Sequence, residues 1–145
     1  MANERAIEFV FFDIGGTLGE RAQTGNALEP FPSSAKLLKA LHDVVGLRIG
    51  VITTLGPDLS NTDGLALLHG AGLDQFIDPH GFISDHDAGV AKPNAQIYRL
   101  AAQRVGVPIG QCLYVGESLI EVIGALSAGM QAILKPCPPG RELPV

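Results

Sequence analysis

Residues 7–20 have the sequence IEFVFFDIGGTLGE, which predicts a buried strand followed by a sharp turn. Residues 7–12 are almost continuously apolar, a pattern typical of a central strand in a parallel sheet that is covered on both faces. The run ends at Asp13, and the closely spaced glycines after it favour a tight turn. Because ligands of parallel α/β sheets bind beyond the carboxyl ends of the strands, Asp13 is the first candidate functional residue.

The rest of the chain alternates β-rich runs with helical patterns. We expect further strands at residues 47–52, 82–84, 112–115 and 131–134. Helical patterns run from Ser33 or Ser34 to Gly46, around Leu65 and Leu68 to Gly70 or Gly72, from Pro93 or Asn94 to Val105, and over residues 119–128. Residues 13–32 are expected to include an irregular flap. This alternation predicts an α/β fold, a three-layer α/β/α sandwich around a parallel, five-stranded, Rossmann-like sheet.

Length and composition indicate one folded domain. The 145 residues suit a single domain over 1–145, in which 135–145 form an extended tail. The chain is 46% hydrophobic and 17% charged, which favours a packed core over disorder. Its net charge of -5 provides no positive field that would attract nucleic acid or anionic lipid. Cys112 and Cys137 have neither metal-ligand spacing nor the density of a disulfide scaffold.

Targeting signals are absent from the sequence pattern. The first residues place acids and an arginine before a short apolar run, unlike the basic segment and cleavage site of a secretory signal. The longest apolar stretches are far shorter than the roughly 20 residues that a membrane helix needs. We therefore expect a cytoplasmic protein with no membrane partner.

The first four expected strands are each followed by polar residues. These are Asp13 after the first strand, Thr53 and Thr54 after the second, Asp85 and Asp87 after the third, and Glu117 and Ser118 after the fourth. In a parallel sheet these positions share one edge, so we expect the side chains to gather there. Asp85 and Asp87 belong to a polar loop, in which we expect solvated side chains rather than ligands.

Four short motifs occur in order at these strand ends and helix starts. FFDIGGTLG at 11–19 contains Asp13 and Gly15, VITT at 51–54 contains Thr53, AKPNAQIY at 91–98 contains Lys92, and LYVGESLIEV at 113–122 contains Glu117 and Glu121. In order and spacing, these segments resemble the four motifs of the haloacid dehalogenase superfamily of phosphatases and related hydrolases. The resemblance runs through most of the chain and implies the Rossmann-like fold of that superfamily.

The resemblance also implies roles for individual residues. Asp13 is the expected nucleophile, which attacks phosphorus and forms an aspartyl-phosphate, with Thr53 and Lys92 as its catalytic partners. The Lys92 ammonium and the Thr53 hydroxyl are expected to bind the phosphoryl oxygens, together with backbone N–H groups near Gly16 and Thr54.

A Mg²⁺ cofactor is a further implication, held by Asp13, the backbone carbonyl of Gly15, Glu117 and Glu121. In the superfamily, an aspartate at the position of Gly15 protonates the leaving oxygen and then activates water. Such proton transfer contributes about 10²–10⁴-fold to the rate, and glycine cannot supply it. Three explanations stay open: another acid such as Glu20 substitutes, the leaving group needs no proton, or catalysis has been lost.

The spacing between the motifs bears on the substrate. The intervals are filled by the core helices and strands, so we expect no cap domain. An open site implies a bulky or macromolecular phosphorylated substrate, or a homo-oligomer in which a neighbouring subunit closes the site. The favoured hypothesis is a Mg²⁺-dependent hydrolase of the phosphatase type. The alternative is a non-catalytic or regulatory protein that uses the same fold to bind a protein or a phosphorylated ligand.

Overall fold

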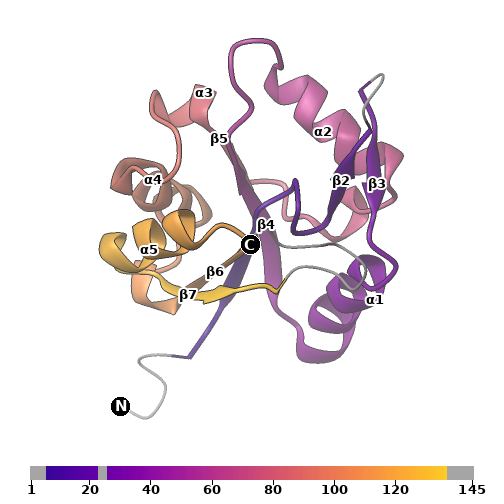
Figure 1. Ribbon diagram of the computed structural model, residues 1–145. Coiled ribbons are helices and arrows are strands. Elements are labelled where there is room, and N and C mark those ends of the chain that lie inside the picture. Colours follow the sequence, from indigo (N-terminus) through magenta and orange to yellow (C-terminus); the bar gives the residue numbers. More distant parts are fainter. Residues whose placement is uncertain (1–5, 23–25, 137–145) are drawn as a thin grey trace.

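Five parallel strands form the centre of the protein in a computed structural model that describes residues 6–22 and 26–136 (Figure 1). The strands are β1 (Phe9–Phe12), β4 (Arg48–Thr53), β5 (Phe82–Ser84), β6 (Cys112–Gly116) and β7 (Gln131–Leu134). Their order in the sheet is β5-β4-β1-β6-β7, and every neighbouring pair is parallel. The predicted five-stranded parallel sheet is confirmed, with the fully buried β1 as its central strand.

Helices cover both faces of this sheet. They are α1 (Ser34–Lys39), which continues as a π-helical turn (Ala40–Val45), α2 (Asn61–Gly70), α3 (Asp85–Ala88), α4 (Ala95–Val105) and α5 (Leu119–Ala128), with short 3₁₀ turns at Asp74–Phe76 and Ile109–Gln111. Figure 1 shows α4 and α5 on one side of the sheet and α1 and α2 on the other. The predicted three-layer α/β/α sandwich is therefore confirmed.

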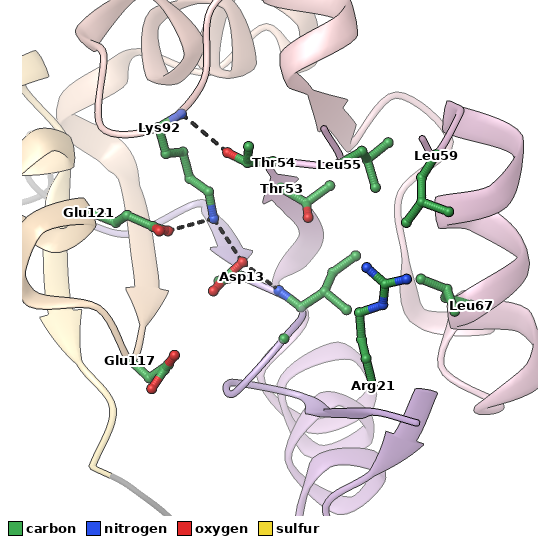
Figure 2. Close-up of a pocket in the computed structure, with 12 residues that line it drawn as sticks. Asp13, Arg21, Thr53, Thr54, Leu55, Leu59, Leu67, Lys92, Glu117 and Glu121 are labelled. Carbon is green, nitrogen blue, oxygen red and sulfur yellow. Dashed lines mark hydrogen bonds and ion pairs between the residues drawn. The ribbon is translucent and has the colours of Figure 1, made fainter. Parts of the chain in front are cut away.

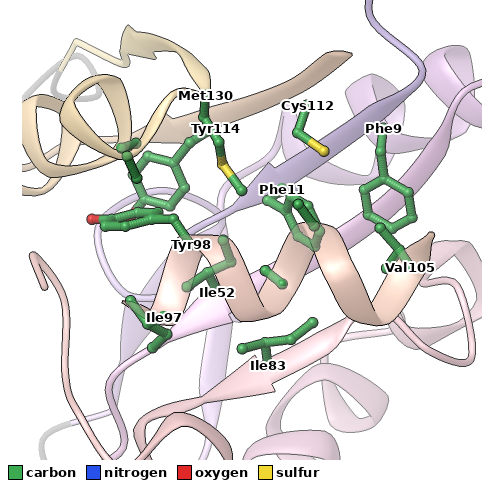
Figure 3. Close-up of a cluster of buried hydrophobic side chains, with 14 of the residues drawn as sticks. Phe9, Phe11, Ile52, Ile83, Ile97, Tyr98, Val105, Cys112, Tyr114 and Met130 are labelled. Atoms are coloured by element: carbon green, nitrogen blue, oxygen red, sulfur yellow. The ribbon is translucent and has the colours of Figure 1, made fainter. Parts of the chain in front are cut away.

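The side chains of β1 alternate between two hydrophobic clusters because successive residues of a strand point to opposite faces. Phe9 and Phe11 pack with residues of α4 and α5, as Figure 3 shows for the cluster beside α4. Val10 and Phe12 pack in the second cluster, which includes Leu38 of α1 and residues of α2. This two-sided burial explains why the four residues of β1 are all apolar, and the strand ends just before Asp13.

The interval between β1 and α1 contains an antiparallel hairpin, β2 (Gly19–Arg21) and β3 (Leu28–Pro30). We predicted an irregular flap there, and the pairing of these two short strands was missed. Leu18 and Leu28 are buried and tie the hairpin to the second cluster. The strands are only three residues long, too short for a visible alternation of apolar and polar positions.

Within the described residues, the intervals between the motifs hold only this hairpin and the core elements, and no cap domain is present. None of the helices in that part of the chain is long and apolar enough to cross a membrane. Most of the expected tail, together with Cys137, lies outside the described residues. Its first residue, Lys135, lies over the ring of Phe31 and donates a hydrogen bond to the backbone oxygen of Thr17.

Candidate active site

A cavity of about 260 Å³ lies at the carboxyl ends of β1, β4 and β6 (Figure 2). Its lining consists of Asp13, Ile14, Gly15, Arg21, Thr53, Thr54, Leu55, Leu59, Leu67, Lys92, Glu117 and Glu121. The structure thus brings together residues from all four motifs, although they are far apart in the sequence. Arg21 and the three leucines were not among the candidates identified from the sequence.

The ammonium group of Lys92 lies against the carboxylate of Asp13. Lys92 Nζ is 2.7 Å from Asp13 Oδ1, and the same oxygen accepts a 2.8 Å hydrogen bond from the backbone N–H of Ile14. The Lys92 side chain is 1% exposed and that of Asp13 is 14% exposed. Among the described residues, both contacts are made to Oδ1, so Oδ2 is the oxygen that remains available to a ligand in the cavity.

Glu121 and Tyr114 fix the position of the Lys92 ammonium group. Lys92 Nζ lies 2.7 Å from Glu121 Oε1 and donates a 3.0 Å hydrogen bond to the hydroxyl of Tyr114. That hydroxyl in turn donates to Glu121 Oε1 at 3.1 Å. Burial and the nearby charges of Asp13 and Glu121 raise the pKa of Tyr114, which keeps its hydroxyl protonated and able to donate.

Tyr114 is a site residue that the sequence analysis missed. It lies within the apolar strand β6, where an aromatic residue is usually a core residue. The available signal was its hydroxyl, because a buried tyrosine hydroxyl normally requires a hydrogen-bond partner. Tyr114 lies two residues before Gly116, the last residue of β6, and seven before Glu121. Its hydroxyl therefore finds its partners, Lys92 and Glu121, at the cavity.

Close packing of α5 places Glu121 beside Lys92. A Cβ on Gly124 would lie only 2.6 Å from the backbone oxygen of Pro93, so glycine permits this approach. The hydroxyl of Tyr98 donates a 2.7 Å hydrogen bond to the backbone oxygen of Glu121. These two contacts fix the first turn of α5 against the segment that carries Lys92.

Burial raises the pKa of Asp13 above its ordinary value of 3.8, and the charge of Glu121 acts in the same direction. The charge and hydrogen bond of Lys92 oppose this shift. Desolvation makes a carboxylate more basic, and a more basic carboxylate is a stronger nucleophile. The environment of Asp13 therefore suits nucleophilic attack.

Thr53 is the last residue of β4 and Thr54 follows it, and both lie on the side of Lys92 away from Glu121 (Figure 2). Thr53 is buried, and its side chain lies in the cavity near Asp13 (Figure 2). The Thr54 hydroxyl accepts a 3.3 Å hydrogen bond from the backbone N–H of Lys92. Thr54 thus helps to hold the loop that carries Lys92, a role that the sequence analysis did not assign to it.

The turn after β1 brings Gly16 against Glu117. Gly16 has a φ of +77°, and a Cβ there would lie 2.6 Å from the Glu117 side chain. The turn therefore requires glycine for its backbone conformation, and a larger residue would also displace the Glu117 side chain.

Oxygen donors suitable for Mg²⁺ are present on the cavity wall, namely the carboxylates of Asp13 and Glu117 and the main chain of Gly15. No group of three or more His, Cys, Asp or Glu side chains within 6–22 and 26–136 is arranged to hold a metal ion. Mg²⁺ in phosphate-handling sites commonly takes one or two carboxylates plus water and substrate oxygens, so this donor set fits it. The Glu121 carboxylate is instead engaged by Lys92 and Tyr114.

Comparison with known proteins identifies the family. A family model described as haloacid dehalogenase-like hydrolase matches residues 19–129, well over half of the chain. The chain belongs to the haloacid dehalogenase-like hydrolases. The match begins after Asp13, so the role of Asp13 is not part of it.

Relatives of this haloacid dehalogenase-like chain include both phosphatases and a dehalogenase. Glyceraldehyde 3-phosphate phosphatase from Methanothermobacter thermautotrophicus is 33% identical over 108 residues, which are 74% of this chain and 45% of that protein. The (S)-2-haloacid dehalogenase of Xanthobacter autotrophicus is 30% identical over 112 residues, which are 77% of this chain and 41% of that enzyme. This chain thus spans less than half the length of these two relatives.

A solved structure supports the same assignment. The crystal structure of a HAD phosphatase from Thermococcus onnurineus has a TM-score of 0.65 to this haloacid dehalogenase-like chain at 30% identity. The aligned part covers 79% of this chain and 50% of that phosphatase. The sequence-based recognition of the superfamily and of its Rossmann-like fold is confirmed.

The loop after β4 is held by Asp85, one of the two loop aspartates that we expected to be solvated. Its carboxylate accepts hydrogen bonds from the backbone N–H groups of Leu55 and Gly56, at 2.8 and 3.0 Å. Partial burial opposes ionisation, but these hydrogen bonds hold the pKa of Asp85 below its ordinary value. Asp87 pairs with Arg104 and Asn61. Both aspartates therefore have structural partners, which sequence alone could not identify.

Glu20, the acid that we considered as a substitute at the position of Gly15, is not among the residues that line the cavity. Glu20 and Arg21 are adjacent on β2, and adjacent residues of a strand point to opposite sides. The residue of this pair that lines the cavity is Arg21. The structure therefore does not support proton transfer by Glu20.

Proposed function

We propose that this haloacid dehalogenase-like hydrolase is a phosphatase that uses Asp13 as its nucleophile. The observation that carries the proposal is the buried ion pair between Asp13 Oδ1 and Lys92 Nζ at the wall of an open cavity. Burying two charges is costly in stability, so such a pair inside a cavity is more readily explained by function than by folding. Phosphatases among the relatives of this chain agree with the proposal.

The reaction would proceed in two displacement steps at phosphorus. Asp13 Oδ2 attacks the phosphoryl group, the bond from oxygen to phosphorus forms, and the bond to the leaving oxygen breaks with its electron pair. Water then attacks the phosphorus of the aspartyl-phosphate, which releases inorganic phosphate and restores the carboxylate. Lys92 and Thr53 stabilise the charge on the phosphoryl oxygens in both steps.

The donor set fits Mg²⁺ held by Asp13, the Gly15 carbonyl and Glu117. When bound, the cation neutralises charge on the transferring phosphoryl oxygens. We assign Glu121 to a different task, because its carboxylate is bound to Lys92 and Tyr114. In this arrangement Glu121 is a positioning residue that orients the Lys92 ammonium group toward Asp13.

Gly15 restricts the leaving groups that this site can handle. A Cβ added at Gly15 would meet nothing within 4 Å, so the space that an acid would occupy is empty. Without an acid there, the leaving oxygen must depart as an anion or take its proton from water. The site therefore favours phosphate esters and anhydrides with good leaving groups, such as aryl and acyl phosphates.

We further propose a cytoplasmic location.

Steady-state hydrolysis of 4-nitrophenyl phosphate and acetyl phosphate, with and without Mg²⁺, tests this function. We expect metal-dependent turnover by the wild type and a loss of at least about 10³-fold in Asp13→Asn, because removal of a nucleophile abolishes the covalent route. Asp43→Asn is the matched control, since Asp43 lies outside the cavity lining and pairs with Lys39 and His42 on the surface of its own helix. Equal turnover by wild type and Asp13→Asn contradicts the proposal. No turnover by the folded wild type favours the non-catalytic alternative.

A further inference from the structure

The cavity has a second end, away from Lys92, whose chemistry the hydrolytic reaction does not use. We define the Arg21 end by Arg21 of β2, Leu55 and Leu59 of the loop after β4, and Leu67 of α2. Figure 2 shows these four side chains across the cavity from Lys92 and Glu121, with the guanidinium group of Arg21 close to Leu59 and Leu67. The wall is thus cationic and apolar there, whereas the wall around Asp13 carries carboxylates.

The hairpin holds Arg21 in this position. Arg21 pairs with Leu28 of β3, which is buried in the core. The base of the hairpin is tied down by Leu18, whose backbone oxygen accepts hydrogen bonds from the hydroxyl of Ser34 at 2.7 Å and from the N–H of Phe31 at 2.9 Å. Arg21 therefore projects into the cavity from an anchored element.

Arg21 differs from Lys92 in its partners. Lys92 is neutralised by Asp13 and Glu121, whereas the guanidinium group of Arg21 donates a 3.2 Å hydrogen bond to the neutral amide oxygen of Asn26. A guanidinium group has five N–H donors in a planar fork that matches a carboxylate or a phosphate. Arg21 consequently offers a positive charge and further donors to an anion at that end of the cavity.

The size of the cavity limits what can reach both ends. Sites for drug-sized ligands enclose about 300–1,000 Å³, and this cavity, at about 260 Å³, lies just below that range. A compact molecule can fill it from Asp13 to Arg21. A small substrate can therefore contact both ends of the cavity, in place of the bulky or macromolecular substrate, or the closure by a neighbouring subunit, expected from the sequence.

We infer that the substrate is a small phosphate compound with a compact apolar body and a second anionic group, which Arg21 binds while the phosphoryl group lies at Asp13. The inference rests on the proposed function and adds to it the substrate class and a specificity-determining residue. The second anion is a carboxylate or a second phosphate, because a guanidinium group binds both in the same bidentate manner. The three leucines contact the apolar body between the two anions.

Matched aryl phosphates test this inference. The probes are 4-carboxyphenyl phosphate, its carboxamide analogue 4-carbamoylphenyl phosphate, and benzene-1,4-diyl bisphosphate. The first two have nearly the same shape and differ in one charge. We expect wild-type kcat/KM for the carboxylate to exceed that for the carboxamide by about ten- to a hundredfold, the scale of one charge-assisted hydrogen-bond pair. In Arg21→Gln this ratio falls to about one, mainly through KM, and Arg21→Lys restores part of it.

Arg99→Gln is the control, because Arg99 is an exposed arginine on α4 outside the lining of this cavity. The wild-type ratio is expected to persist in that variant. A stronger preference for the bisphosphate, lost in Arg21→Gln, supports the inference with phosphate as the second anion. No wild-type preference for either the carboxylate or the bisphosphate over the carboxamide, or a preference unchanged in Arg21→Gln, overturns it.

A binding measurement separates failure of this inference from failure of the proposed function. Calorimetry with 4-carboxybenzylphosphonate and its carboxamide analogue, which cannot be hydrolysed, measures the same preference without turnover. Tighter binding of the carboxylate that is lost in Arg21→Gln supports recognition of the second anion even if no probe is hydrolysed. Equal binding of the two phosphonates by the wild type overturns the inference while leaving hydrolysis through Asp13 intact.

Discussion

Gly15 lies two residues after the proposed nucleophile, Asp13, with open space at its Cα, and its φ is outside the left-handed region. Gly15→Asp should therefore fold normally and place a carboxyl group at the cavity. We expect it to raise kcat for an alkyl phosphate by about 10²–10⁴-fold, because general acid catalysis assists departure of a poor leaving group. The gain for 4-nitrophenyl phosphate should be much smaller. Steady-state rates on both substrates check this, and equal gains on both would argue against a missing proton donor.

The two charged neighbours of Asp13 shift its pKa in opposite directions. Burial raises the pKa of Asp13, Lys92 lowers it and Glu121 raises it. Asp13 must be ionised to attack, so activity falls as the pH drops through this pKa. Lys92→Met removes the lowering effect and should move the acid limb of kcat/KM to higher pH, as well as reducing the rate. Glu121→Gln removes the raising effect and should move the same limb to lower pH.

The measurement is a pH–rate profile of kcat/KM for the three proteins. Opposite displacements of the acid limb are expected for the two variants. Displacement in the same direction, or profiles that superimpose after scaling, would mean that the limb reports a group other than Asp13.

The site residues that could be predicted from the sequence are polar residues that belong to one of the four motifs. Asp13, Thr53, Lys92 and Glu117 line the cavity together, as their positions at strand ends and helix starts suggested. Arg21 was not predictable because it lies outside all four motifs, and Tyr114 was missed because, although it lies in the fourth motif, its place in an apolar strand is typical of a core residue. The role of each arises from a contact with a residue distant in sequence, Arg21 across the cavity and Tyr114 with Lys92.

At the scale of elements, the turn after β1 contains two adjacent glycines, of which the turn depends on Gly16 and not on Gly15. Gly16→Ala should lower the free energy of unfolding by about 1–2 kcal/mol, because a Cβ is strained at a φ of +77° and must also displace the Glu117 side chain. Gly15→Ala is the matched control, with no neighbour within 4 Å of the added Cβ. We expect the control to change stability by less than about 0.5 kcal/mol. Urea unfolding of the two variants checks this, and equal stability would contradict the described turn.

The strands were more predictable than the elements between them. All five sheet strands occur where apolar runs predicted them. Burial on both faces explains the continuous signal of the three inner strands, β4, β1 and β6, whereas the edge strand β7 is partly exposed. The expected helix up to Gly46 is α-helical only to Lys39 and continues as a π-helical turn. Among the apolar residues of this segment, Leu38 is fully buried, while Leu37 and Val45 are exposed. Tertiary packing, which a local pattern does not contain, decides which of these residues the sheet covers.

At the scale of the whole molecule, the parallel topology explains how a short chain assembles the cavity. The order β5-β4-β1-β6-β7 places β1 between β4 and β6, so residues that follow these three strands meet at one edge. Packing of α5 then places the Glu121 carboxylate against the Lys92 ammonium group. The chain spans less than half the length of the phosphatase and the dehalogenase that it resembles. Those relatives differ in activity, so the proposed function depends on which group the substrate transfers to Asp13.

The most direct test is to identify that group by acid quenching the protein during turnover of acetyl phosphate and mapping its peptides by mass spectrometry. We predict one phosphoryl group on the peptide that contains Asp13, labile to hydroxylamine and absent from Asp13→Asn. Turnover without a phosphorylated peptide, or the same modification in Asp13→Asn, would contradict nucleophilic attack by Asp13.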